Sequence, residues 1–395
     1  SRSPGNNALT RCRRVDAATA AGSSCGISLE YGAQSSPMKR LNASEKGVAR
    51  LDWAVGCSLV PDGFSLVADG FSLIPALSHP VKPPSARRYG WGMVDVRGRL
   101  SAPELDARLR RLSFKDDDRE ELLKAADAVA GSPELLNQVT GLVDRLLPII
   151  GVLDPEPGAD PFDCAAGCSD DLGIGVLSML ALVATVEEVQ AFHRSRGISE
   201  KLSWRALSDL GQQTYVHRLT YGSFGLHTQG WLCVAWSGAL YWLGRLQFNL
   251  HREGAEWLLS THIPRTGPLT PASVDASFAQ AVQFFGEHFP DYQLSGFFCS
   301  SWLLDPELAA ALSPTSNMAC FQRRWNLFGE PMQGDADALF FTFARRGDID
   351  LDCLPQDTSL QRAIVGRLRS GGHWHVWNGR KPLSSVPEQL PGLNR

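Results

Sequence analysis

The stretch from Glu256 to Phe285 most constrains the fold, because its residue pattern changes from strand to helix across one short loop. The segment EWLLSTHIP predicts an apolar strand with His262 at its end, and a helix is predicted to begin at Thr270 or Pro271. The first N–H groups of such a helix would face the loop beside the imidazole. This arrangement suits a ligand that carries phosphates and whose reaction includes a proton transfer.

The segments before this stretch predict a helical region after a long irregular start. Residues 1–92 are rich in serine, alanine, glycine and proline, show little periodicity and are expected to be mostly disordered. Apolar residues then recur at three- and four-residue steps, which is typical of helices. The predicted helices span 101–112, capped by Ser101, and 117–130, 132–150, 175–197 and 203–222.

The pattern changes again after residue 225. Apolar and aromatic runs predict consecutive antiparallel strands at 230–238, 239–253 and 256–264. The elements predicted after them are a helix at 271–288, a strand at 292–304, a short helix at 305–312, strands at 321–329 and 338–347, and a helix at 359–370. The prediction is an α+β fold with a helical N-terminal domain at 93–210, a mixed sheet with helices at 211–385 and a C-terminal tail at 386–395.

The composition argues against several classes of partner. A formal net charge of −4 over 395 residues gives no electrostatic reason to expect nucleic acid. No apolar run reaches the roughly 18 residues that a membrane span requires, so none is expected. Nine scattered cysteines, an odd number, indicate reduced thiols in a cytoplasmic protein. Cys164 and Cys168 have no second pair at zinc-type spacing, so no metal site is predicted.

Six segments occur in one order along the second half of the chain: TYVHRLTYGSFGL, LGRLQFNLHR, HIPRTGPLTPASVD, SWLLDPELAAAL, FQRRWNL and LPQDTSLQRAIVGRLRSGGHW. They resemble the two-part acyltransferases that join a helical N-terminal domain to a GNAT-like C-terminal domain, a family that includes the N-acyltransferases of teicoplanin-class glycopeptide biosynthesis. The resemblance covers roughly residues 100–385. It implies transfer of an acyl group, a long fatty one in some members, from acyl-CoA as co-substrate to an amine acceptor, with no further cofactor. Amino sugars of antibiotics and other secondary metabolites are acceptors of this kind.

The resemblance also implies where the co-substrate binds. In GNAT-type folds acyl-CoA lies where two neighbouring strands splay, and its pyrophosphate meets the loop between the fourth strand and the next helix. Here that loop is Arg265 to Leu269, and the usual glycine-rich motif is absent, since PRTGPL has one glycine and Pro264 and Pro268 cannot donate an N–H group. We therefore expect Arg265 to supply charge and Thr266 a hydroxyl. Gly267 and Thr270 are expected to supply further donors.

His262 is the candidate general base, since an imidazole titrates near neutral pH. The alternative is a histidine that only satisfies backbone partners at a strand end. Ser300 and Trp302, on the strand expected to splay from that of His262, are candidates to line the pantetheine channel, although Trp302 also suits a core position. No Cys-His-Asp motif indicates a thiol nucleophile, so direct attack of the amine on the thioester is the simplest mechanism.

Four other histidines are given structural roles. His217 and His227 flank the junction between helices and strands and are expected to be ordinary surface or interdomain residues. His373 and His375 share one strand face, a spacing that would suit a metal, but no third ligand is evident. Two functional alternatives stay open: an acyltransferase for an unrelated small amine, and a non-catalytic acyl-CoA-binding or scaffold protein.

Overall fold

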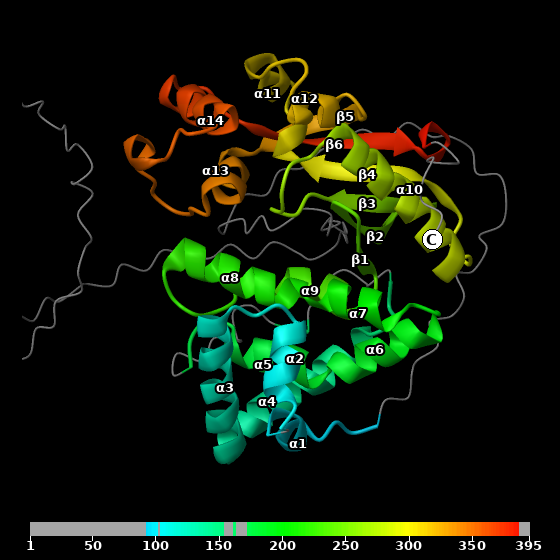
Figure 1. Ribbon diagram of the computed structural model, residues 1–395, viewed down its shortest axis with the longest axis vertical. Helices are drawn as coiled ribbons and strands as arrows, with labels where there is room; N and C mark the ends of the chain where they lie inside the picture. The colour runs from blue at the N-terminus through cyan, green and yellow to red at the C-terminus, as the bar shows by residue number, and fades with distance from the viewer. Residues whose placement is uncertain (1–91, 102, 154–160, 163–171, 387–395) are drawn as a thin grey trace, which may run out of the picture. The chain divides into compact units, whose positions relative to one another are not determined.

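The computed structural model describes residues 92–101, 103–153, 161–162 and 172–386 (Figure 1). Apart from residues 92 and 386, the N-terminal extension expected to be disordered and the C-terminal tail lie outside the described residues, as do Cys164 and Cys168. All described residues belong to one unit of the chain. Helices precede a mixed sheet with helices, so the predicted α+β class is confirmed.

The first half of the described chain is helical. Its helices are α1 (Val96–Leu100), α2 (Leu105–Arg111), α3 (Asp116–Gly131), α4 (Pro133–Leu146), α5 (Val176–Ala184), α6 (Val186–Ser195), α7 (Glu200–Leu207), α8 (Asp209–Tyr221) and α9 (Gln229–Trp236). α4 begins where sequence predicts, because Ser132 accepts a hydrogen bond from the Leu135 amide and Pro133 occupies the first turn. Every residue of α5 is buried, so this helix is the centre of the helical half.

Three helix predictions need correction in this half. Ser101 does not cap a helix at its start but ends α1, and α2 begins at Leu105 after Glu104. The helix predicted at 175–197 is two helices, α5 and α6, separated at Thr185. The Thr185 hydroxyl donates to the carbonyl oxygens of Ala181 and Leu182, a local bond that bends helices. The helix predicted at 203–222 is likewise divided, because α7 ends before Ser208 and α8 begins after it.

The second half contains a six-stranded sheet of order β1-β2-β3-β4-β6-β5. Its strands are β1 (Leu240–Leu243), β2 (Leu246–Glu253), β3 (Glu256–His262), β4 (Leu294–Ser301), β5 (Asn326–Gln333) and β6 (His375–Pro382). All neighbouring strands are antiparallel except β3 and β4, which are parallel and joined through α10 (Pro271–His288). The predicted strand, loop and helix from Glu256 onward are therefore confirmed.

The two faces of the sheet are covered by different helices (Figure 1). α10 packs on one face, where the Phe278 ring lies 5.8 Å from that of Phe248 and 4.7 Å from that of Phe297, measured between centroids. α9 packs on the other face, where the Trp231 ring lies 4.7 Å from that of His262. The sheet therefore has a buried aromatic face packed on α10 and a second face that meets the helical half.

Two predictions around the first strands are wrong. Residues 230–238 do not form a strand, since α9 occupies 230–236, and the predicted strand at 239–253 is two strands, β1 and β2. The turn between these strands requires Gly244: its φ is +67°, and a Cβ there would lie 2.6 Å from the hydroxyl oxygen of Ser277 on α10. The helix–strand error reflects a short apolar run whose periodicity fits both structures.

The C-terminal elements differ from prediction in a similar way. The short helix α11 (Pro306–Ala311) and the helix α14 (Ser359–Arg369) are confirmed, and Thr358 caps α14 in a capping box. Residues 321–329 are divided between α12 (Asn317–Gln322) and β5. The run at 338–347 is not a strand, because residues 338–343 belong to α13 (Asp335–Phe343), which is followed by Ala344 in a left-handed conformation. β4 stops at Ser301, and Trp302 begins a short 3-10 turn.

Across the described segments, no helix taken singly has the length and apolarity of a membrane span. α5 and α6 meet that criterion only as a pair, which is bent by 44°.

Candidate active site

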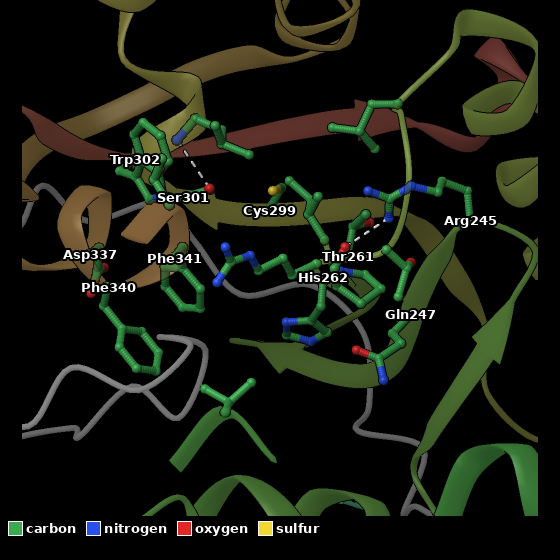
Figure 2. Close-up of a pocket in the computed structure, with 18 of the residues that line it drawn as sticks. Arg245, Gln247, Thr261, His262, Cys299, Ser301, Trp302, Asp337, Phe340 and Phe341 are labelled. Carbon is green, nitrogen blue, oxygen red and sulfur yellow. Dashed lines mark hydrogen bonds between the residues drawn. The ribbon is translucent and has the colours of Figure 1, made fainter. Parts of the chain in front are cut away.

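A cavity opens where β3 and β4 separate. Their parallel pairing ends at Ser260 and Phe298, although β3 continues to His262 and β4 to Ser301. The cavity has a volume of about 380 Å³, which is within the range of small-molecule sites. Its walls come from α8, α9, the β1–β2 turn, the ends of β2, β3 and β4, the loop before α10, and α13 (Figure 2). The expected splay of these two strands is therefore present.

His262 stands at the end of β3 and lines this cavity (Figure 2). Its Nε2 lies 2.5 Å from Oδ1 of Asn249, whose Nδ2 donates to the carbonyl oxygen of Leu250 at 2.7 Å. Because the amide nitrogen is occupied in this way, the amide oxygen faces the imidazole and Nε2 must be the protonated ring atom. Nδ1 then carries the lone pair, and no residue in the described part of the chain hydrogen-bonds to it.

The environment of His262 keeps its ring neutral. Burial, with a smaller contribution from the charge of His251, lowers the pKa of His262 to about 3. The edge of the Trp231 indole packs against the ring at an interplanar angle of 70°. At neutral pH the histidine is therefore an unprotonated imidazole with one fixed tautomer, which leaves a lone pair to accept a proton, but a pKa this far below neutral makes it a weaker base than an exposed imidazole.

Asp209 is a cavity residue that the sequence did not reveal. It is the first residue of α8, is 1% exposed, and its Oδ2 accepts a hydrogen bond from Nε1 of Trp231 at 2.6 Å. The side chains of Gln213 and Gln247 also donate to it, while burial raises the pKa of its carboxyl group above the ordinary value. Asp209 thus fixes the indole that packs on His262. In the sequence, an aspartate in the first turn of a helix is an ordinary feature, so only the tertiary structure shows that Asp209 lines the cavity.

The loop between β3 and α10 lines the cavity on a second side. Arg265, Thr266 and Gly267 belong to its walls, and Gly267 has a φ of +60°. The Thr266 amide donates to the carbonyl oxygen of Pro264 at 2.8 Å, which closes a tight turn. Thr270 is not among the cavity residues: its hydroxyl oxygen caps α10 by accepting from the Ser273 amide.

The end of β4 forms the opposite wall. Ser300 lines the cavity, and its buried hydroxyl has no hydrogen-bond partner among the described residues. Trp302 also lines it while being only 3% exposed, so it is both a wall and a core residue. Burial raises the pKa of the Cys299 thiol, so this cysteine is held as a neutral thiol rather than as a nucleophilic thiolate.

The other histidines have partners away from His262. Nδ1 of His217 lies 3.1 Å from Nδ1 of His227, and burial lowers the pKa of both to about 4. His373 Nδ1 lies 2.7 Å from a carboxylate oxygen of Asp335, and the His375 backbone amide donates to Asp305. In the described segments, no group of three or more metal-ligating side chains is placed to hold a metal ion.

Comparisons with known proteins agree with the fold. The model of the N-acyltransferase N-terminal domain matches residues 103–238, and that of the GNAT-like C-terminal domain matches residues 240–381. None of the curated proteins matches the chain.

Solved structures match over most of their length. An acyltransferase in complex with decanoyl-CoA and teicoplanin is 34% identical with a TM-score of 0.64, over 70% of this chain and 86% of that one. An acyltransferase in complex with CoA and 10C-Teicoplanin is 33% identical with a TM-score of 0.65, over 71% and 88%. An acyltransferase mutant in complex with octanoyl-CoA is also 33% identical with a TM-score of 0.66, over 72% and 88%.

A helical domain joined to a GNAT-like sheet, with a cavity where two parallel strands separate, defines an acyltransferase of the GNAT-like class. The chain belongs to the family of acyltransferases built from an N-acyltransferase N-terminal domain and a GNAT-like C-terminal domain. The resemblance read from the sequence is confirmed.

Proposed function

We propose that this protein is an acyl-CoA-dependent N-acyltransferase that transfers a fatty acyl group to the amine of an amino sugar on a glycopeptide-type natural product. The observation that carries the proposal is the cavity at the separation of β3 and β4, with a neutral His262 at its wall. Relatives of 31–34% identity bind decanoyl-CoA, octanoyl-CoA or CoA in their solved structures, and two of them also hold teicoplanin or 10C-Teicoplanin.

The reaction requires no covalent intermediate with the protein. The acceptor amine attacks the thioester carbonyl carbon, a C–N bond forms, and the C–S bond breaks as CoA leaves with the electron pair. Nδ1 of His262 accepts the proton that the amine loses, because Nε2 is engaged with Asn249 and Nδ1 is unprotonated. The proton released from nitrogen balances the one that the CoA sulfur gains.

The thioester oxygen needs a donor as negative charge develops on it. The Ser300 hydroxyl is buried in the cavity wall and has no partner in the described part of the chain, so it is available for that role. Arg265, Thr266 and Gly267 line the same cavity and would contact the phosphate end of acyl-CoA, with Trp302 beside the pantetheine. Thr270 would act indirectly, by fixing the start of α10 after the loop.

A thiol-release assay tests the function. Acetyl-CoA, octanoyl-CoA and decanoyl-CoA are each incubated with a panel of amines that includes a teicoplanin pseudoaglycone and free glucosamine, and products are identified by mass spectrometry. We expect acylated pseudoaglycone, formed fastest with the longer chains. Thiol release with simple amines alone would assign the enzyme to another acceptor, and tight acyl-CoA binding without any release would indicate a binding or scaffold protein.

A further inference from the structure

One arginine contacts the backbone of the loop between β3 and α10 at three points. Arg245, in the turn between β1 and β2, donates from Nη1 to the carbonyl oxygen of Pro264 at 2.9 Å and from Nη2 to that of Gly267 at 3.0 Å. Its Nε lies 3.3 Å from the carbonyl oxygen of Pro268. Figure 2 shows the Arg245 side chain reaching across the cavity wall toward this loop. All three guanidinium nitrogens therefore contact a loop of five residues.

The position of Arg245 is itself fixed by the sheet and by α10. Its backbone amide donates to the Ser277 hydroxyl at 2.7 Å, and the preceding Gly244 adopts a left-handed conformation that brings the turn against α10. From the helical half, Arg205 donates to the carbonyl oxygen of Gly244 at 2.9 Å. The β1–β2 turn that carries the guanidinium is therefore fixed by hydrogen bonds to α10 and to α7.

The contacts of Arg245 turn the loop amides away from it. In a trans peptide the C=O and N–H groups point in opposite directions. When the carbonyls of Pro264 and Pro268 face the guanidinium, the amides of Arg265 and Leu269 face away from it. Within the described residues these two amides and that of Gly267 make no hydrogen bond, so they are free to meet a ligand.

Arg245 also leaves positive charge at the cavity. No carboxylate of the described segments forms an ion pair with it, although it is partly buried and burial lowers its pKa. A half-buried cation without a counter-ion has lost part of its hydration, and an anion bound nearby compensates for that loss. The loop next to it carries a second arginine, Arg265, that lines the same cavity.

We propose that Arg245 is the positioning residue that replaces the missing glycine-rich motif: it holds residues 264–268 in the shape that presents free amides to a diphosphate, and its charge favours that anion from across the loop. The inference rests on the proposed function, since acyl-CoA brings that diphosphate to this loop. A guanidinium is suited to the task because its planar fork bonds several carbonyls at once and stays charged.

The test compares Arg245→Gln and Arg245→Lys with the unmodified protein. Calorimetry measures binding of CoA, of 4′-phosphopantetheine, which has one phosphate, and of pantetheine, which has none. For Arg245→Gln we expect CoA affinity to fall about 10- to 100-fold, the size typical of lost charge-assisted hydrogen bonds, with pantetheine binding within about twofold of the original. Arg245→Lys keeps the charge but not the planar fork, so its CoA affinity should lie between those of Arg245→Gln and the unmodified protein. The KM for acyl-CoA should rise more than kcat falls.

Arg323→Gln is the matched control, because Arg323 also donates to a backbone carbonyl, that of Pro314, but lies outside the cavity. It should bind CoA as the unmodified protein does. Unchanged CoA affinity in Arg245→Gln, or an equal loss for CoA and pantetheine, would overturn the inference. Should Arg245→Gln fail to fold, the inference requires Arg245→Lys to fold with weakened CoA binding, and unchanged binding there overturns it. Absence of CoA binding by the unmodified protein would instead refute the proposed function.

Discussion

The two faces of the sheet around β2, β3 and β4 carry different kinds of residue. On the face against α10, the rings of Phe248, Phe278 and Phe297 pack together with centroids 4.7–5.9 Å apart. On the opposite face, Asn249 and His262 form a hydrogen-bonded pair beside Trp231. Because side chains alternate along a strand, one short segment supplies both faces. The α10 face therefore contributes stability, and the proposed function places the chemistry on the α9 face.

His262→Ala should produce the largest change on the chemical face. Loss of a general base lowers kcat by about 100- to 10,000-fold. CoA affinity should stay within a few-fold, because the diphosphate contacts lie on the loop. His373→Ala is the control, since His373 is exposed and pairs with Asp335 outside the cavity. A kcat within twofold of the original for His262→Ala would assign the histidine a purely structural role.

Phe297→Ala tests the opposite face. Removing a fully buried ring costs about 3–5 kcal/mol of unfolding free energy, measured by denaturant titration. Phe341→Ala is the matched change on the cavity side, where the ring is 40% exposed, and its loss should stay below about 1 kcal/mol. Equal losses of unfolding free energy in the two variants would contradict the claim that the α10 face contributes more to stability than the cavity side does.

Ser300→Ala removes the unpartnered hydroxyl from the cavity wall. If that hydroxyl stabilises the developing oxyanion, kcat falls by about 10- to 100-fold, somewhat less than for a full oxyanion-hole donor. The unfolding free energy should be unchanged or slightly higher, because the substitution breaks no hydrogen bond of the folded protein and removes a buried hydroxyl that has no partner among the described residues. A stability loss without any change in kcat would show that the hydroxyl is structural.

Asn249→Ala sharpens the interpretation of the His262 tautomer. Without the amide oxygen the imidazole is free to change tautomer, and kcat should fall about five- to tenfold, corresponding to one hydrogen bond of roughly 1 kcal/mol. Nitrogen-15 NMR of labelled histidine reports the tautomer directly. An unchanged Nε2–H tautomer and unchanged kcat would show that Trp231 packing alone orients the ring.

Mild acid should affect stability before it protonates His262 in the folded protein. His193 and His262 have pKa values lowered to about 3, and His217 and His227 to about 4, chiefly by burial. The unfolded chain takes up protons near pH 6.5, so the unfolding free energy should be largest above that pH and fall steadily toward pH 4. Thermal melts between pH 7.5 and 4.5 measure this, and a Tm independent of pH would contradict the burial of these rings.

The sequence predicts the centre of the site better than its surroundings. The strand ending at His262, the loop and α10 are local features, set by apolar periodicity and by Thr270 and Pro271 at the helix start. The runs at 230–238 and 338–347 were predicted as strands and are helical, because short apolar and aromatic runs fit both periods and packing decides between them.

The remaining site residues become visible only when distant segments meet. Asp209 and Trp231 are 22 residues apart and hydrogen-bonded across two helices. Arg245 reaches carbonyls 19–23 residues further along the chain. Neither contact leaves a motif in the sequence, since both depend on how the helical half and the β1–β2 turn pack against the sheet.

A crystal structure of the protein with decanoyl-CoA tests the central claim most directly. The proposed function predicts the thioester between β3 and β4, with its carbonyl carbon beside His262 and Ser300 and the diphosphate at residues 264–268 and Arg245. Decanoyl-CoA bound with its thioester outside this separation, or with its diphosphate away from the loop, would contradict the assignment of this cavity as the acyl-transfer site.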